Sequence, residues 1–351
     1  MQLKEHQKKP FKKELQRGVI IFALLVMVFA MKVVPIPQSG VGLLFTMIVF
    51  MSFIAPIFLL SNVTLIKAFR SDPNRSFQQF VLLVFVLFVL AGAYAASTGQ
   101  FNTLKFAIAG LWIVLCIFLL FKIMQRSQTS IFDYFMVLAL WLPLQFSLFG
   151  EIHIPAVGSV TGAFSLLSLF LLIYAFYVIR EYPMGFTFKL TGQDLRTVVL
   201  NFILFFFIMV IIGILTRLLA IADRIPQMSV VLSQLFFIYF FIALPQEFLF
   251  RGVIYRMLIR NFKGRRYAVG KALLISSILF SLARANAPIG PVIDINFGPL
   301  GIWKAPWAYM ILMTAAGLFY GLVFVRTKKI TAAASIHLLV EWTWLVFFSA
   351  R

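Results

Sequence analysis

The sequence is poor in acidic residues, in histidine and in cysteine. Its 351 residues include 11 Asp plus Glu, three His and one Cys, and charged residues make up 12% of the chain. Soluble globular domains carry about 25% charged and about 45–50% apolar residues, whereas 62% of this chain is hydrophobic. That composition excludes a single water-soluble core. The lone Cys116 lies in an apolar run, which excludes a disulfide framework and a cysteine-based zinc site.

The few charges that are present are mostly positive. The 31 Lys plus Arg give a formal net charge of +20, which in a soluble protein would suggest a nucleic-acid partner. In a chain this apolar, basic residues in loops instead fix the orientation of the spans in a membrane. We therefore expect membrane lipid, and no nucleic acid, among the partners.

Long apolar runs predict the fold class. A helix needs about 20 apolar residues to cross a bilayer, and runs of about that size predict an all-α, polytopic transmembrane bundle with about eleven spans. The predicted spans cover residues 18–34, 41–66, 77–96, 104–124, 131–149, 157–179, 197–221, 228–245, 268–285, 307–325 and 330–348.

The basic residues are distributed unevenly across these spans. With the N-terminus in the cytoplasm, 23 Lys and Arg fall on the inner side and seven on the outer side, as the positive-inside rule requires. The sequence thus predicts a multi-pass protein of the inner (cytoplasmic) membrane. The apolar stretch after the basic tail lacks a small-residue cleavage pattern and is predicted to be a retained first span.

Polar breaks divide the chain into four segments. A long break rich in charge, Pro and Gly separates six predicted spans from five. The expected domains are a basic cytoplasmic tail (1–17), a six-span region of unknown role (18–180), a cytoplasmic linker (181–196) and a C-terminal five-span region (197–351).

Charged side chains that lie inside spans or directly after one concentrate in the C-terminal region. Glu247 and Arg251 are spaced i,i+4, as are His337 and Glu341, so each pair shares a helix face. Ionisable groups in a membrane carry an insertion penalty of roughly 2.5–3.5 kcal/mol each and are functional candidates. The competing interpretation is that these pairs only fasten spans together.

Three motifs in this region resemble those of a known family. Residues 244–252 read LPQEFLFRG, residues 276–284 read SSILFSLAR, and residues 335–341 read SIHLLVE. They resemble, in order, the motifs E-E-x-x-x-R, F-x-x-x-H and H-x-x-x-N of the intramembrane peptidases that process C-a-a-X proteins and bacteriocins. The resemblance covers about residues 195–350.

The resemblance implies an activity and a site. In that family the first Glu and the second-motif His activate the attacking water, while the third motif stabilises the oxyanion or binds a metal. It implies an endopeptidase acting on membrane-embedded peptide or protein substrates, with a site at Glu247, Arg251, Arg284, His337 and Glu341. The resemblance leaves open whether the water is bound to a divalent metal such as zinc or is activated by Glu alone, with His337 and Glu341 as the ligands if a metal binds.

The chain departs from the family pattern at three positions. Gln246 stands for the first Glu, Arg284 for the second-motif His, and Glu341 for the Asn. Neither an amide nor a guanidinium can act as a general base. Either Glu247 or Glu341 has become the base, with Glu341 the better candidate because Arg251 neighbours Glu247, or Arg284 pairs with a Glu and the site no longer catalyses.

Three functions therefore remain open from the sequence. The first is an intramembrane peptidase with a divergent site. The second is a catalytically inactive descendant that binds membrane helices or partner proteins. The third is a proton-coupled transporter, although the two halves show no matched broken helices. The kinship and the proposed chemistry both require that four side chains meet in one polar chamber, namely Glu247, Arg284, His337 and Glu341.

Overall fold

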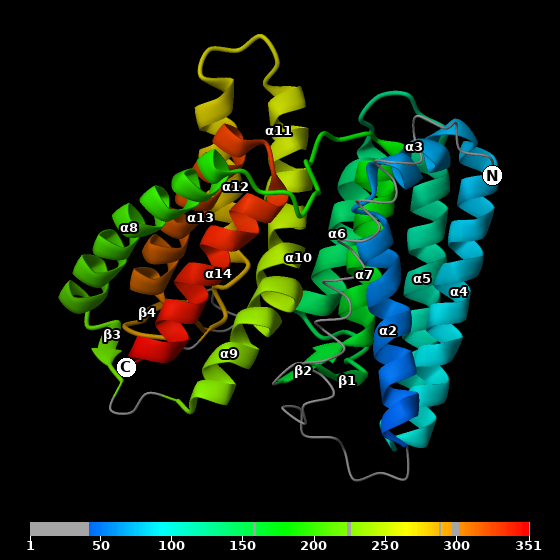
Figure 1. The fold of residues 1–351 in the computed structure, drawn as a ribbon, viewed down its shortest axis with the longest axis horizontal. Coiled ribbons are helices and arrows are strands. Elements are labelled where there is room, and N and C mark those ends of the chain that lie inside the picture. The colour runs from blue at the N-terminus through cyan, green and yellow to red at the C-terminus, as the bar shows by residue number, and fades with distance from the viewer. Residues whose placement is uncertain (1–41, 157–158, 223–225, 288, 297–301, 351) are drawn as a thin grey trace. The chain divides into compact units, whose positions relative to one another are not determined.

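The computed structural model describes residues 42–156, 159–222, 226–287, 289–296 and 302–350. The basic tail and the predicted span at 18–34 lie outside the described residues. The chain forms two compact units, unit 1 up to Tyr182 and unit 2 from Pro183 onward. Figure 1 colours the chain from blue to red, so that unit 2 runs from green to red.

The structure confirms a helical, multi-pass membrane protein but not the number of eleven spans. By length and composition, six described helices can cross a membrane, and a seventh span is possible if a pair bent by 81° counts as one. The six are Pro73–Ser97, Thr103–Met124, Gly192–Leu215, Met228–Asn261, Trp307–Thr327 and Ile330–Phe347. Three other predicted spans correspond to shorter apolar helices, Ile131–Gln145, Ala163–Ile179 and Ala268–Leu282.

The run at 41–66 is the bent pair, and its sequence explains the bend. Helix α2 (Leu43–Leu59) contains Pro56, which disturbs its last turn. Helix α3 (Val63–Ser71) then starts afresh, because the Asn62 side chain accepts hydrogen bonds from the backbone of Thr64 and Leu65. A prolonged apolar run therefore contains two helices.

Unit 1 is a helical bundle around one central helix. Its remaining elements are α4 (Pro73–Ser97), α5 (Thr103–Met124), α6 (Ile131–Gln145), β1 (His153–Ala156), β2 (Ser159–Gly162), α7 (Ala163–Ile173) and the π-helical η1 (Tyr174–Ile179). Nearly every residue of α7 is buried, as expected of a helix that is apolar on all sides. It packs against α2, α4 and α6, and β1 and β2 form an antiparallel hairpin before it.

Unit 2 contains the residues singled out from the sequence. Its elements are α8 (Gly192–Leu215), β3 (Leu219–Ile221), α9 (Met228–Phe237), η2 (Ile238–Ala243), α10 (Leu244–Glu247), η3 (Phe248–Ile254), α11 (Tyr255–Asn261), α12 (Ala268–Leu282), β4 (Ile293–Asn296), β5 (Ile302–Ala305), α13 (Trp307–Thr327), α14 (Ile330–Phe347) and β6 (Phe348–Ala350). Strands β4 and β5 form an antiparallel hairpin, and β3 pairs antiparallel with β6. Helix α14, which is red in Figure 1, packs against α8, α10 and α13.

Two glycines allow α13 to approach its neighbours closely. A Cβ atom at Gly317 would lie 3.0 Å from the Ser277 Cβ atom, and one at Gly321 would lie 2.6 Å from Leu273 Cδ2. Both contacts are with α12, and the two glycines are four residues apart on one face of α13. Small residues at this spacing are typical of close helix packing in membranes.

Candidate functional site

The first motif lies in a helix whose winding changes along its length. Residues Met228–Asn261 form one long helix, but α10, which carries Gln246 and Glu247, is a short α-helical stretch between the π-helical η2 and η3. Arg251 lies within η3. Wide π turns are rare and are frequent at functional sites, because they rotate side chains out of the regular α-helical register.

Three fully buried side chains form the inner layer of the site. Glu247 Oε2 lies 3.2 Å from Arg251 Nε, and His337 Nδ1 lies 2.9 Å from Glu247 Oε1. All three side chains have an exposed fraction of 0%. The Glu247 carboxylate therefore connects the long helix to α14.

Arg251 is held by further contacts. Its Nη2 donates to the carbonyl of Gly317 at 2.7 Å, which is possible because no side chain on that residue blocks the approach. Its guanidinium carbon lies 4.7 Å from the ring centre of Phe280 and 5.5 Å from that of Tyr320. Such cation–π contacts help to stabilise a cation that has left water.

Arg284 forms the outer layer of the site. Its Nη1 donates to Glu341 Oε1 at 2.6 Å and its Nη2 to Gln246 Oε1 at 2.7 Å. The same Nη2 lies 3.3 Å from His337 Nε2, and Nη1 lies 3.1 Å from Met313 Sδ. One guanidinium thus joins residues from the long helix, α13 and α14.

The contacts of His337 bear on which of its ring nitrogens carries the proton. Arg284 can only donate hydrogen bonds, so its contact with Nε2 matches the tautomer in which Nε2 is bare and Nδ1 donates to Glu247, whereas a proton on Nε2 would instead face Glu341. The ring stacks on Tyr320, with centres 4.6 Å apart and planes at 19°. Glu341 Oε1 is 3.4 Å from Nε2, so this nitrogen is the ring atom nearest the outer layer.

The two layers differ in their access to the surroundings. The Arg284 and Glu341 side chains are 15% and 28% exposed, and Gln246 is also partly exposed. The formal charges of Glu247, Arg251, Arg284 and Glu341 sum to zero when His337 is neutral. The site is therefore a charge-balanced cluster with a sealed inner layer and an accessible outer layer.

The donor set does not fit the divalent metal that the resemblance implies. In the described part of the chain, no group of three or more His, Cys, Asp or Glu side chains could hold a metal ion. His337 Nδ1 faces Glu247, while Nε2 and the Glu341 carboxylate face Arg284. A divalent cation bound by His337 and Glu341 would lie beside this permanent positive charge, which repels it.

The structure brings together all five residues that the sequence singled out. The i,i+4 contacts of Glu247 with Arg251 and of His337 with Glu341 are both present. Counting helical rise along the sequence puts Arg284 at a greater depth than His337, yet the structure places the two side chains in contact. That convergence followed from the resemblance, since residue counting alone does not give it.

Three further residues of the site were not expected from the sequence, namely Met313, Gly317 and Tyr320. All three lie on α13, which carries none of the three motifs. The available signal was the pair of glycines on α13, since close helix packing predicts that this helix borders the buried charges.

Comparison with known proteins agrees with this geometry. A family model described as type II CAAX prenyl endopeptidase Rce1-like matches residues 228–343. The matched segment contains the three motifs and every residue of the cluster. No curated protein and no solved structure matches the chain. Through these C-terminal helices the chain is similar to the CAAX protease and bacteriocin-processing family, and the match over residues 228–343 agrees with the three motifs.

Proposed function

We propose that this membrane protein binds membrane-associated peptide or protein segments at the Arg284–Glu341 edge of the cluster and does not hydrolyse them. The observation that carries the proposal is the set of contacts made by Arg284 with Gln246, His337 and Glu341. Peptide hydrolysis in this fold needs a group that takes a proton from water. Here the amide of Gln246 and the guanidinium of Arg284 stand at the two positions that supply it in the family.

The remaining carboxylates are poorly suited to replace that base. Glu247 is fully buried, lies against Arg251 and accepts from His337. Glu341 forms an ion pair with Arg284 at 2.6 Å. A carboxylate held beside a cation is a weaker base than a free one. The chain therefore keeps the three motifs in order without a strong proton acceptor among them.

The outer layer supports binding. Arg284 presents N–H donors, while Glu341 and Gln246 present oxygen acceptors, and all three are partly exposed. A peptide backbone offers the complementary carbonyl and N–H groups, which in a membrane have few other partners. In the family, peptides are the substrates, so a peptide segment is the ligand class that fits. We place the protein in the cytoplasmic membrane with its N-terminus inside, because of the bias in loop charge.

One experiment separates binding from hydrolysis. The full chain in nanodiscs is mixed with a fluorescent membrane-embedded peptide, and both binding and cleavage are measured. The Arg284→Gln/Glu341→Gln variant keeps the cluster neutral and is expected to weaken binding about tenfold, equal to about 1.4 kcal/mol. The matched control is Asp294→Asn/Lys304→Gln, which removes an opposite-charge pair facing across the β4–β5 hairpin. Equal loss of affinity in both variants contradicts binding at this edge.

A second candidate is hydrolysis by a relocated base. The observation in its favour is that Glu341 is 28% exposed and lies 3.4 Å from His337 Nε2, so a base and a histidine remain adjacent. The cleavage assay decides between the candidates, with His337→Ala/Glu341→Ala as the inactive reference. Cleavage by the wild type that this variant loses overturns the non-hydrolytic proposal, whereas equal background in both supports it.

A further inference from the structure

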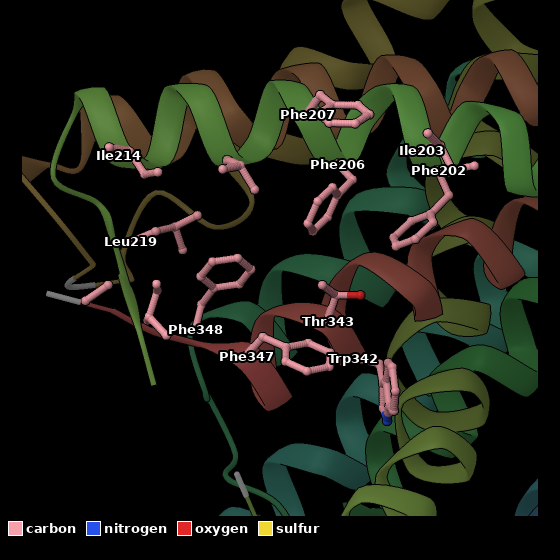
Figure 2. A pocket seen from close by; sticks show the side chains of 13 residues that line it. Phe202, Ile203, Phe206, Phe207, Ile214, Leu219, Trp342, Thr343, Phe347 and Phe348 are labelled. Atoms are coloured by element: carbon pink, nitrogen blue, oxygen red, sulfur yellow. The ribbon is translucent and has the colours of Figure 1, made fainter. Parts of the chain in front are cut away.

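Unit 2 contains an apolar groove of about 790 Å³ between α8 and α14, with β3 at one end. In Figure 2, Phe202 and Phe206 project from α8 toward the side of α14 that carries Thr343 and Phe347. Leu219 of β3 completes the lining at its end. The groove is separate from the charge cluster, although Trp342, which also lines it, directly follows Glu341 in α14.

The groove offers almost nothing for a polar ligand to bind. Its walls are aromatic and aliphatic, and the indole nitrogen of Trp342 is already used, since it donates to the carbonyl of Val231 at 3.0 Å. The hydroxyl of Thr343 is the remaining side-chain polar group in the lining. A water molecule needs two to four polar partners to occupy a cavity stably. The occupant must therefore be a hydrocarbon.

We propose that this groove binds the acyl chains of an anionic phospholipid. The alternative hydrocarbon is an apolar helix of another protein, but helices associate in membranes through small residues or interhelical hydrogen bonds. This lining is bulky, with Ala220 and Thr343 as its two small residues. Flexible acyl chains, in contrast, can adapt to an irregular wall of Phe, Ile and Leu side chains. Helices α8 and α14 are both membrane spans, so acyl chains surround the groove.

The size of the groove agrees with such an occupant. A cavity of about 150 Å³ holds a benzene molecule, which is roughly 25 Å³ for each carbon. At that ratio the groove accommodates roughly 30 carbon atoms, close to the two chains of one phospholipid. The groove also communicates with the surface, and α8 exposes apolar side chains such as Ile211 beside it. A lipid can therefore enter from the bilayer.

Charge at one end of the groove favours an anionic headgroup. Arg217 follows the last turn of α8, and its backbone N–H donates to the carbonyl of Ile214, a lining residue, at 3.1 Å. Arg217 is exposed, and no acidic residue in the described ranges forms an ion pair with it. Arginine near the end of a span extends its cation to the headgroup layer. There it attracts a lipid phosphate more strongly when the lipid bears net negative charge.

Two neighbouring residues of α8 provide a matched test. Val210 lines the groove, whereas Ile211 is exposed and does not line it. The full chain is purified with phosphatidylglycerol and phosphatidylcholine, and retained lipid is counted by native mass spectrometry. The wild type is expected to keep about one phosphatidylglycerol per chain. Val210→Phe should lower its retention at least fivefold, Ile211→Phe should leave it unchanged, and Arg217→Gln should remove the preference for phosphatidylglycerol.

A second readout locates the lipid. Trp342 lines the groove, so a phospholipid with brominated acyl chains should quench its fluorescence, measured as the difference between wild type and Trp342→Phe. Val210→Phe should abolish that quenching. If this variant fails to fold, Ala220→Phe replaces it, because it fills the groove from β3 and should abolish the quenching in the same way. Equal retention and equal quenching in Val210→Phe and Ile211→Phe overturn the proposal. So does the capture of a protein segment or a second chain in the groove in place of lipid.

Discussion

Each unit contains buried charges, but the two arrangements differ. In unit 1, Arg180 contacts both carboxylate oxygens of Asp133, at 2.5 and 2.6 Å. Asp133 also accepts from the backbone N–H of Ser130 at 2.7 Å and so caps α6. In unit 2, Glu247 is shared between two partners and Arg284 among several. In unit 1 a single carboxylate pairs with a single guanidinium, whereas in unit 2 the charged side chains form a branched network.

The difference distinguishes a structural ion pair in unit 1 from the candidate functional site in unit 2. The Asp133–Arg180 pair fixes the start of α6 to the segment after η1, and it has the bidentate geometry of a strong structural contact. In the network, Glu247 Oε2, Arg251 Nε and Tyr320 Oη are buried without a hydrogen-bond partner. Under-satisfied buried groups are uncommon and concentrate at functional sites. Variants of the two arrangements should therefore behave differently.

The largest effect is expected when Arg251 is replaced by Met. The change leaves the Glu247 carboxylate buried without a cation and removes the bond to the Gly317 carbonyl. Breaking a buried ion pair lowers the free energy of unfolding by about 3–5 kcal/mol, which denaturation of the full chain in detergent can measure. Glu247→Gln/Arg251→Met should regain part of that loss. A single variant as stable as the wild type would contradict charge compensation at this position.

The second-largest loss of stability is expected from Asp133→Asn in unit 1. Asparagine keeps one oxygen acceptor for the cap of α6 but loses the charge that binds Arg180. Hydrogen bonds to charged groups contribute about 1.5–3 kcal/mol, so the loss of stability should be of that order. Hydrogen exchange should increase in α6 and leave α13 and α14 unchanged. Increased exchange in α14 would show that the pair is not a local anchor.

A smaller effect is expected from Arg284→Gln. Arg284 and Glu341 are 15% and 28% exposed, so their pair is less completely desolvated than the fully buried pair of Glu247 and Arg251, and exposed pairs contribute about 0.2–1 kcal/mol. We expect a loss of stability of about 1 kcal/mol, measured in the same denaturation assay as Arg251→Met. If the two variants lose equal stability, the distinction between a sealed inner layer and an accessible outer layer is wrong.

Local spacing was the part of the site that the sequence could predict. The i,i+4 pairs follow from helix geometry alone, and the contacts of Glu247 with Arg251 and of His337 with Glu341 confirm them. The bundle itself follows from the apolar runs. Apart from a closed β-barrel, only a helix can pair all its backbone N–H and C=O groups within lipid. Both predictions depend on neighbours in the chain.

The contacts between helices could not be derived in the same way. Arg284 lies beyond the end of α12, so extending a straight helix past Leu282 misplaces it. The π-helical turns around α10 also change the direction of side chains, and nothing in the residue spacing signals them. The number of eleven spans is not confirmed in the described residues, because an apolar run shows neither how long its helix is nor where it bends, as between α2 and α3.

The smallest effect, a dependence on pH, is expected in unit 1 outside the spans. Glu151 accepts hydrogen bonds from the backbone of Phe164 and Ser165 at the start of α7. Burial is the largest influence on its pKa and raises it above the ordinary value of 4.5, while these hydrogen bonds and the nearby His153 act in the opposite direction. A raised pKa means that the folded state favours the protonated carboxyl.

The sign of the pH effect follows from that preference. The protonated form contributes its stability below pH 4.5, and the contribution is lost as the pH rises through the raised pKa. Glu151→Gln keeps an acceptor for α7 and cannot titrate. The stability of the wild type relative to this variant should therefore fall between acidic and neutral pH, which thermal denaturation at several pH values can measure.

The matched control is Glu181→Gln, which replaces an exposed carboxylate of the same unit. Parallel curves for wild type and Glu151→Gln would mean that burial at the start of α7 does not favour the protonated acid.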